Sequence, residues 1–517
     1  MNRHFSPIGR VFIALVVFFG LSGCNESLWG EDDPWLSATP ESFWTVVPTS
    51  LAITPPETPT PTPFLAETST PSGPTSTPAP PLLYYTQSGD SLPVVAAHFG
   101  VTPADISSSL PLSPTGLLDP AIPLVIPNRL DGVACTPSAQ VLPDSEVVYS
   151  PTAIDFDVEA YVVAQGGYLS DYREYLASVG WVDGAQAVEK SAIENSINPR
   201  LLLALLEYQA GWVRGQPTNL LQTDYPLGYS SLIDRGLFQQ LRWASEQLML
   251  GYYGWRGGTL TELHFPDGST LRLAPDLNAG TVALMYYFSQ NYNYDEWLLM
   301  MDARVGFAAL YTEMFGDPWL RAAAVEPLFP PGLTQPALSL PFEPGQIWSF
   351  SGGPHPAWNR QGALAALDFA PPSTESGCQP SDAWVLASAP GRVVRAGNGV
   401  VVLDLDGDGY EQTGWNLLYL HVATLDRVQV GTWVEADGRI GHPSCEGGMA
   451  TGTHVHFARK YNGEWVLADG PLPFTLSGWV AHNGEAPYQG TLTRGDEVVI
   501  ARTNGMYDTH IVRQPGE

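Results

Sequence analysis

Apolar positions follow a helical period through the middle of the chain. Within 183–195 they fall close to the spacing of one helix face, which predicts an amphipathic helix. A second helix is expected from Pro199 to about Trp212, with Asn198 as its cap and Pro199 in its first turn. Further apolar stretches predict helices at 280–288 and 296–314. We therefore expect residues 150–335 to form a mainly helical domain.

After residue 336 the pattern changes to short apolar runs separated by Gly and Pro turns. Strands are expected at 384–388, 391–396 and 400–404. Strands spaced this closely indicate an antiparallel sheet or barrel. We therefore expect a multidomain chain whose C-terminal domain, 336–517, is an antiparallel β structure.

A smaller unit is expected at 83–128, joined by a linker at 129–149. It begins with a strand at 83–86 and a helix at 93–99. Thr102 can cap a second helix with Pro103 at its first position, and a closing strand follows at 122–127.

The segments 85–92 and 126–128 of this unit resemble the start and end of LysM modules. The resemblance implies a βααβ fold that binds glycans containing N-acetylglucosamine. A small structural domain without a ligand is the alternative.

The N-terminus has the features of an export signal. Arg3 and Arg10 precede and flank an apolar run at 11–21, which is shorter than the about 20 residues that a membrane-spanning helix needs. The segment 21–24 resembles the lipobox of bacterial lipoproteins, which implies a signal peptide at 1–24 and lipidation of Cys24. An ordinary signal with a chance cysteine is the alternative. We expect a protein exported and lipid-anchored to the envelope of a bacterium.

Residues 25–82 form a linker, of which 47–82 is dominated by Pro, Thr and Ser. Such a composition cannot build a core and predicts an extended spacer. The formal net charge of −30 argues against a nucleic-acid partner, which requires a clustered basic surface. A chain of this charge would be repelled by anionic lipids unless a covalent anchor held it.

Three cysteines remain besides Cys24, so at most one internal disulfide can form. Cys378 and Cys445 fall in the same predicted domain and are the expected pair. Cys135 would then be free, although the sequence leaves other pairings open.

The segment 196–211 resembles the core helix of lysozyme-like lytic transglycosylases. That family places its catalytic glutamate where this chain has Gln209, and an amide cannot donate a proton as a carboxylic acid does. Glu207 lies about 200° round the helix from the same groove. We expect an inactive relative that binds glycan or acts as a spacer, with an unrelated helical bundle as the alternative.

Five of the ten histidines fall between 355 and 456. Side chains two apart on a strand point to the same face, so His454 and His456 can reach one site. Hydrolytic zinc sites use three N or O ligands and keep a fourth position open for water. The pair therefore indicates part of a metal site.

The segments 445–448, 451–457 and 419–421 resemble the lysostaphin-type zinc endopeptidases, and most closely their beta-lytic and staphylolytic branch. The usual His-x-x-x-Asp motif of the family is absent, because Leu364 stands four residues before Asp368. The beta-lytic branch carries its first histidine upstream in a Gly-x-His turn, and residues 352–355 supply one. The resemblance implies one Zn²⁺ per chain, held by His355, Asp368 and His456.

We expect His454 to act as general base, and His421 to stabilise the oxyanion or protonate the leaving amine. A β domain that has lost its metal is the alternative. His442 is expected to be a bystander. Residues 404–409 resemble the start of a calcium loop, but Trp415 stands where the bidentate acid would be, which favours a simple acidic turn.

The function expected from these features is hydrolysis of peptide bonds in peptidoglycan cross-links. Two other functions remain open: a non-catalytic scaffold that positions another hydrolase, and an adhesion or sensing lipoprotein that acts through its helical domain. The sequence does not identify the bond that is cut.

Overall fold

The computed structural model describes residues 79–373, 376–503 and 505–516. The predicted signal peptide, the lipobox with Cys24 and nearly all of the predicted linker at 25–82 lie outside these residues. Among the helices described, none combines the length and the apolar character needed to cross a membrane.

The first unit pairs strands β1 (Leu82–Tyr85) and β2 (Pro123–Ile126) in an antiparallel sheet. Helix α1 (Leu92–Phe99) lies between them in the chain and ends at Gly100 with φ 65°, a conformation that glycine adopts without strain. The predicted second helix is only the 3₁₀ turn Pro103–Asp105, capped by Thr102. Four serines and two prolines follow within 107–114, and these residues do not extend a helix.

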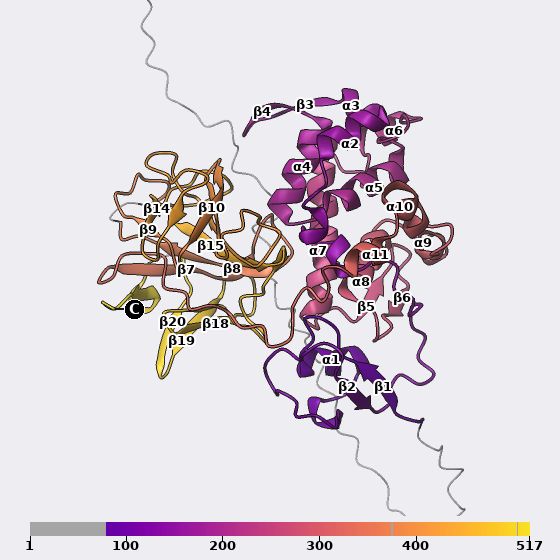
Figure 1. Ribbon diagram of the computed structural model, residues 1–517, viewed down its shortest axis with the longest axis horizontal. Helices are drawn as coiled ribbons and strands as arrows, with labels where there is room; N and C mark the ends of the chain where they lie inside the picture. The colour runs from indigo at the N-terminus through magenta and orange to yellow at the C-terminus, as the bar shows by residue number, and fades with distance from the viewer. Residues whose placement is uncertain (1–78, 374–375, 504, 517) are drawn as a thin grey trace, which may run out of the picture. The chain divides into compact units, whose positions relative to one another are not determined.

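The middle region is helical, as predicted (Figure 1). Its helices are α2 (Val158–Gln165), α3 (Tyr168–Asp171), α4 (Gly184–Asn195), α5 (Pro199–Ala210), α6 (Leu220–Asp224), α7 (Leu237–Arg256), α8 (Ala279–Ser289), α9 (Tyr294–Met301), α10 (Phe307–Phe315) and α11 (Pro318–Ala322). Two hairpins project from them, β3 (Arg173–Leu176) with β4 (Gly180–Asp183) and β5 (Glu262–His264) with β6 (Thr270–Arg272). Short 3₁₀ turns occupy Asp144–Glu146 and Pro151–Ala153.

The predicted helices at 183–195, 198–212 and 280–288 are confirmed as α4, α5 and α8. The prediction of one helix over 296–314 is wrong, because α9 and α10 are separate. Asp302 leaves the helical conformation with ψ 120°. A Cβ atom on Gly306 would lie 2.3 Å from the Met300 carbonyl oxygen, so the chain turns tightly there and needs glycine.

The C-terminal region is the predicted, mostly antiparallel β structure. Its nine-stranded sheet has the order β13-β10-β11-β12-β15-β8-β7-β21, with β16 paired to β15. The strands are β7 (Ile347–Pro356), β8 (Leu364–Ala370), β10 (Gly391–Gly397), β11 (Val400–Asp404), β12 (Trp415–Leu420), β13 (Trp433–Val434), β15 (Val455–Tyr461), β16 (Glu464–Trp465) and β21 (His510–Val512).

Two smaller sheets accompany it. One pairs β9 (Val385–Leu386) with β14 (Arg439–Gly441). The other has the order β17-β18-β19-β20, with strands β17 (Thr475–Leu476), β18 (Trp479–Asn483), β19 (Gly490–Arg494) and β20 (Glu497–Ile500), and the 3₁₀ turn Tyr507–Thr509 follows it.

The nine-stranded sheet buries apolar side chains on both faces. Val401 and Leu403 of β11 pack with Trp479 and Leu492 of the small four-stranded sheet. Val400 and Val402 belong instead to the large apolar cluster that contains the helices. The strands therefore consist largely of apolar residues, as expected for a sheet covered on both sides.

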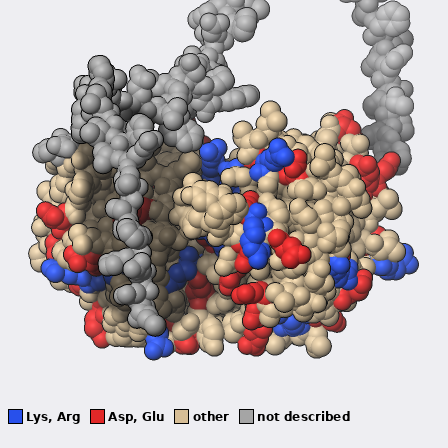
Figure 2. Space-filling view, turned by 90° about the horizontal axis from the view of Figure 1, so that it is seen from above, with Lys and Arg blue, Asp and Glu red and all other residues tan. Residues whose placement is uncertain are grey.

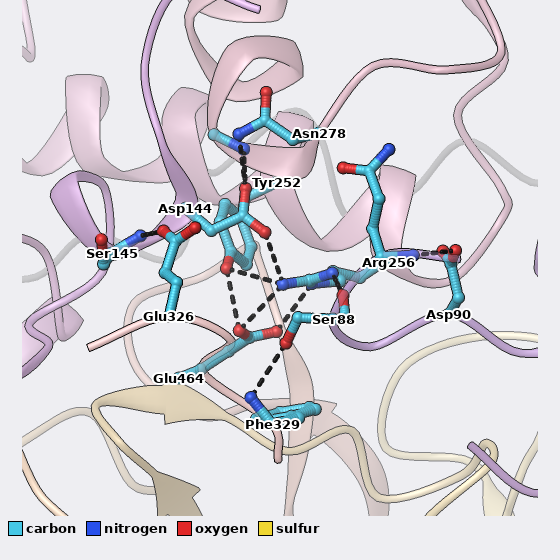
Figure 3. Close-up of polar contacts among 12 residues, drawn as sticks. Ser88, Asp90, Asp144, Ser145, Tyr252, Arg256, Asn278, Glu326, Phe329 and Glu464 are labelled. Carbon is cyan, nitrogen blue, oxygen red and sulfur yellow. Dashed lines mark hydrogen bonds and ion pairs between the residues drawn. The ribbon is translucent and has the colours of Figure 1, made fainter. Parts of the chain in front are cut away.

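One buried arginine connects the three regions (Figure 3). Arg256 of α7 forms ion pairs with Asp144, at 2.7 Å, and with Glu464 of β16, at 2.8 Å. It also donates to the carbonyl of Ser88 in the first unit, and Tyr252 donates to Glu464. Because the guanidinium is buried, each of these partners offsets part of its desolvation cost.

The face shown in Figure 2 carries Lys and Arg side chains singly among Asp and Glu. Neither sign forms a continuous area on that face. A macromolecular polyanion would find no extended basic surface there.

Candidate metal centre

Two neighbouring strands bring Asp368 and His456 together. Asp368 of β8 lies directly opposite His456 of β15, and Leu420 of β12 is the partner of His456 on its other side. Directly opposed side chains in an antiparallel pair share one face. His421 follows β12 immediately, so the next residue along that strand also reaches this edge.

His355 reaches the same point through an irregular stretch of β7. The register with β8 shifts between Phe350 and Gly352 and again before His355. Gly352 stands opposite Asp368, and a Cβ atom on it would lie 2.4 Å from the Asp368 carboxylate. Only glycine leaves room for that carboxylate, which explains the Gly-Gly-Pro-His sequence of the turn.

The side chains of His355, His454 and His456 surround one carboxylate oxygen. His355 Nε2 and His456 Nδ1 each lie 3.3 Å from Asp368 Oδ1, and His454 Nε2 lies 3.7 Å from it. His355 Nε2 and His456 Nδ1 are themselves 2.9 Å apart. Asp368 Oδ1 is buried and accepts no hydrogen bond.

Backbone carbonyls fix the orientation of all four imidazoles. The contacts are His355 Nδ1 to Gly353 O at 2.7 Å, His421 Nδ1 to Glu446 O at 2.9 Å, His454 Nδ1 to Gly452 O at 2.7 Å and His456 Nε2 to Ala357 O at 3.0 Å. A carbonyl can only accept, so each of these ring nitrogens carries the hydrogen. The other nitrogen of each neutral ring then presents a lone pair, as metal-ligating histidines do.

The donor set fits Zn²⁺. His355, Asp368 and His456 offer ligand atoms that all lie within 4.8 Å of one another. Tetrahedral zinc with nitrogen ligands at 2.0–2.1 Å places those ligands about 3.3 Å apart. Converging lone pairs beside an unpartnered carboxylate oxygen favour a positive charge at this point, which either a proton on His355 or a metal ion can supply. Zinc is the divalent ion that two imidazoles and a carboxylate prefer in a hydrolytic site.

The charges in the site respond to one another and to burial. Burial opposes ionisation of Asp368, but His355 and His454 more than offset it and hold the pKa of Asp368 well below its usual range. Burial also disfavours a charged His355, yet the Asp368 carboxylate raises the pKa of that ring. Burial lowers the pKa of His456. Without a metal, His355 is therefore the ligand that takes up a proton first.

Zinc affinity should consequently depend on pH, because zinc must displace one proton from the site when it binds. Below the raised pKa of His355, zinc must displace the proton on that ring, whereas His456, whose pKa burial lowers, takes up its proton only at a lower pH. The affinity should fall about tenfold per pH unit below that pKa and level off above it. Competition with a chromophoric chelator between about pH 5 and 8 measures the slope. An affinity that stayed constant down to pH 5 would contradict this assignment.

His421 depends on a disulfide for its orientation. Burial, together with His454 and His456, lowers the pKa of His421 to about 3, so the ring is neutral. It has φ 65°, and its Nδ1 donates to the carbonyl of Glu446. Cys445, the residue before Glu446, is joined to Cys378, while Cys135 is free.

Loss of this disulfide should impair both stability and catalysis. The bridge spans a sequence separation of 67 residues, for which loop closure contributes roughly 4 kcal/mol to the free energy of unfolding. We expect the double variant Cys378→Ser/Cys445→Ser to melt at a lower temperature and to lose activity while it keeps its zinc. Calorimetry and zinc analysis measure both effects. Cys135→Ser is the matched control, and an equal loss in that variant would refute the role of the bridge.

Tyr488 is a residue of the site that the sequence did not reveal. Its ring stacks on His355 with centroids 4.2 Å apart. Its backbone exchanges hydrogen bonds with the turn, to Gly353 N and Pro354 O. No local pattern connects it to His355, because 133 residues separate them. His442 lies elsewhere, with Nδ1 donating to Ala383 O.

The helical region places Gln209 in a partly buried polar contact with Tyr292. The Gln209 side chain accepts from Tyr292, while its Nε2 is buried without a partner. Glu207 points to the end of its own helix and accepts from the amides of Val213 and Arg214 at 3.0 and 2.9 Å. Glu207 is thus engaged in holding the chain after α5.

Comparison with known proteins gives two family matches. Residues 376–467 match the model of Peptidase family M23, and residues 140–328 match the model of the LasA N-terminal domain. The first range includes His421, His454 and His456 and begins after His355 and Asp368. The helical region is therefore similar to the LasA N-terminal domain over residues 140–328, and its resemblance to lytic transglycosylases stays a prediction.

Two proteases are similar in sequence. Protease LasA of Pseudomonas aeruginosa is 28% identical over 362 residues, which are 64% of this chain and 75% of that protein. Beta-lytic metalloendopeptidase of Lysobacter enzymogenes is 26% identical over 143 residues, 28% of this chain and 77% of that protein. The solved M23 metalloprotease pseudoalterin from the deep sea is 23% identical, covers 32% of this chain and 96% of its own, and has a TM-score of 0.26.

Proposed function

We propose that this chain, a metalloendopeptidase of peptidase family M23 with a LasA-like N-terminal domain, hydrolyses peptide bonds in the cross-links of bacterial peptidoglycan. The observation that carries the proposal is the convergence of His355, Asp368 and His456, with the lone pairs of His421 and His454 beside them. M23 peptidases are zinc-dependent, and this donor set fits zinc.

Zn²⁺ held by these three residues would supply a Lewis acid for the scissile carbonyl and a lowered pKa for the attacking water. The chain itself provides the proton transfers. His454 Nε2 carries no hydrogen and can accept the proton of the water. His421 Nε2 likewise has none, so in its neutral form this ring cannot donate to an oxyanion.

The two histidines therefore carry out successive proton transfers. Their ring centroids are 4.5 Å apart, so both reach the same bound peptide. One ring takes the proton from water, and a ring that has been protonated gives it to the leaving amine. This refines the role expected for His421, which acts as a donor only after it has gained a proton.

The proposal includes the attachment of the protein to the envelope. A lipid on Cys24 would anchor the chain, and the unit at 83–128 would bind glycan as a LysM module. Its order of strand, helix, 3₁₀ turn and strand, with one antiparallel pair, supports that assignment. Retention of residues 79–517 on insoluble N-acetylglucosamine polymer would test the glycan contact.

Digestion of purified peptidoglycan by the zinc-loaded protein tests the reaction. We expect new amino groups to accumulate while reducing sugar ends do not, because the assigned peptidase residues converge and because Gln209 stands where the resemblance to transglycosylases implies a catalytic glutamate. New reducing ends would locate the activity in the helical domain. A zinc-loaded chain that binds the wall and releases neither product would favour the scaffold function instead.

A further inference from the structure

The loop between β11 and β12 concentrates three carboxylates that nothing neutralises. Asp404, Asp406 and Asp408 offer oxygen atoms within 4.8 Å of one another. In the part of the chain that the structure describes, no Lys, Arg or His forms an ion pair with any of them. The fourth acid of the loop, Glu411, is by contrast held by Arg395 and Lys460 at 3.0 and 2.9 Å.

The loop backbone is bent so that these carboxylates can approach one another. The Asp404 carboxylate accepts from the amides of Gly407 and Gly409, both at positive φ. A Cβ atom on Gly414 would lie 2.2 Å from the Asp406 carboxylate.

A buried amide oxygen completes the set independently of the acids. Asn416 of β12 lies directly opposite Asp404 of β11, so the two side chains share a face of the sheet. Asn416 is fully buried, and its Nδ2 donates to the carbonyl of Thr413, a residue of the loop, at 2.7 Å. Its Oδ1 has no hydrogen-bond partner, and Lys460, the next residue across the sheet, donates to Glu411.

We propose that this loop is a Ca²⁺ site whose protein ligands are the carboxylates of Asp404, Asp406 and Asp408 and the Oδ1 atom of Asn416. Calcium takes six to eight oxygen ligands in flexible geometry, so water molecules complete the shell. The three carboxylates together carry a charge of −3, which more than balances the +2 charge of the ion and suits a divalent cation. The absence of a bidentate acid at Trp415 is compensated by Asn416 at the next position.

The site would stabilise the strand that leads to the peptidase centre. Asn416 lies on β12, five residues before His421. Calcium would tie the start of β12 to the end of β11. We expect a dissociation constant of order 10⁻⁴ to 10⁻³ M, as in extracellular calcium modules.

Calorimetric titration of the calcium-free, zinc-loaded chain with CaCl₂ tests the proposal directly. We expect one Ca²⁺ per chain, weaker binding of Mg²⁺ and a melting temperature that rises with calcium. The variant Asp406→Asn/Asp408→Asn changes two exposed residues and should bind calcium at least about tenfold more weakly. Asp496→Asn, an exposed acid of the β19–β20 turn, is the matched control and should bind as the parent does.

A change at the buried amide tests the fourth ligand. Asn416→Asp adds a charge to the set, so it should lower the melting temperature without calcium and bind calcium more tightly than the parent. An affinity equal to that of the parent would remove Asn416 from the ligand set and overturn the site as proposed. Absence of binding in the parent up to about 10 mM CaCl₂ would overturn it as well, as would unchanged binding in Asp406→Asn/Asp408→Asn.

Discussion

Replacement of His355 by alanine is expected to remove zinc and peptidase activity together. Its Nε2 lies 3.3 Å from Asp368 Oδ1 and 2.9 Å from His456 Nδ1, so its loss leaves two ligands. Removal of a residue that only hydrogen-bonds to a metal ligand already lowers metal affinity or activity by about 10- to 100-fold. We therefore expect zinc affinity to fall at least about 100-fold and cross-link hydrolysis to fall below one hundredth of the parent's rate. Metal analysis and release of amino groups measure the two losses.

His442→Ala is the matched control for this variant. His442 belongs to the same domain and packs on the ring of Trp384, with centroids 3.9 Å apart, outside the group that can hold the metal. It should keep its zinc and most of its activity. If His355→Ala also kept both, the turn at 352–355 would not supply a ligand and the assigned centre would be wrong.

Local periodicity predicted those parts of the centre that lie on regular strands. His456 lies on β15, and His454 stands directly before that strand in an isolated bridge with Ser444. The two side chains reach one point because side chains alternate along extended backbone. The pairing of Asp368 with His456 depends on the register between β8 and β15, which could not be predicted from the sequence. His355 could be assigned only from the resemblance to the beta-lytic branch, because the register shifts in β7 remove any regular spacing between His355 and the other ligands.

Apart from the Cys378–Cys445 disulfide, which the sequence analysis expected, contacts between distant segments could not be predicted. Tyr488 reaches His355 from the loop between β18 and β19, and the carbonyls that orient the histidines carry no side-chain signal. The division between α9 and α10 was missed because the apolar residues on both sides of 302–306 were assigned to one helix, although Asp302, Arg304 and Gly306 interrupt the pattern there. Asn416 was also missed, because a polar residue inside a strand reveals its role only when its neighbour across the sheet is known.

Replacement of His454 or His421 by alanine is expected to abolish turnover while zinc remains bound. Neither is a ligand in the assigned set, so metal content should match the parent. Each removes a group that moves a proton, and such groups contribute typically 10²- to 10⁴-fold to rate.

The double variant His421→Ala/His454→Ala distinguishes a shared proton path from two independent contributions. If one proton passes between the rings, the double variant should lose about as much rate as the more impaired single variant. The effects of residues that act as a unit on the rate are not additive. Losses that multiplied instead would assign each ring a separate step. Zinc lost from His454→Ala alone would place that ring, 3.7 Å from Asp368 Oδ1, among the ligands and would overturn the division between metal-binding and proton-transferring histidines.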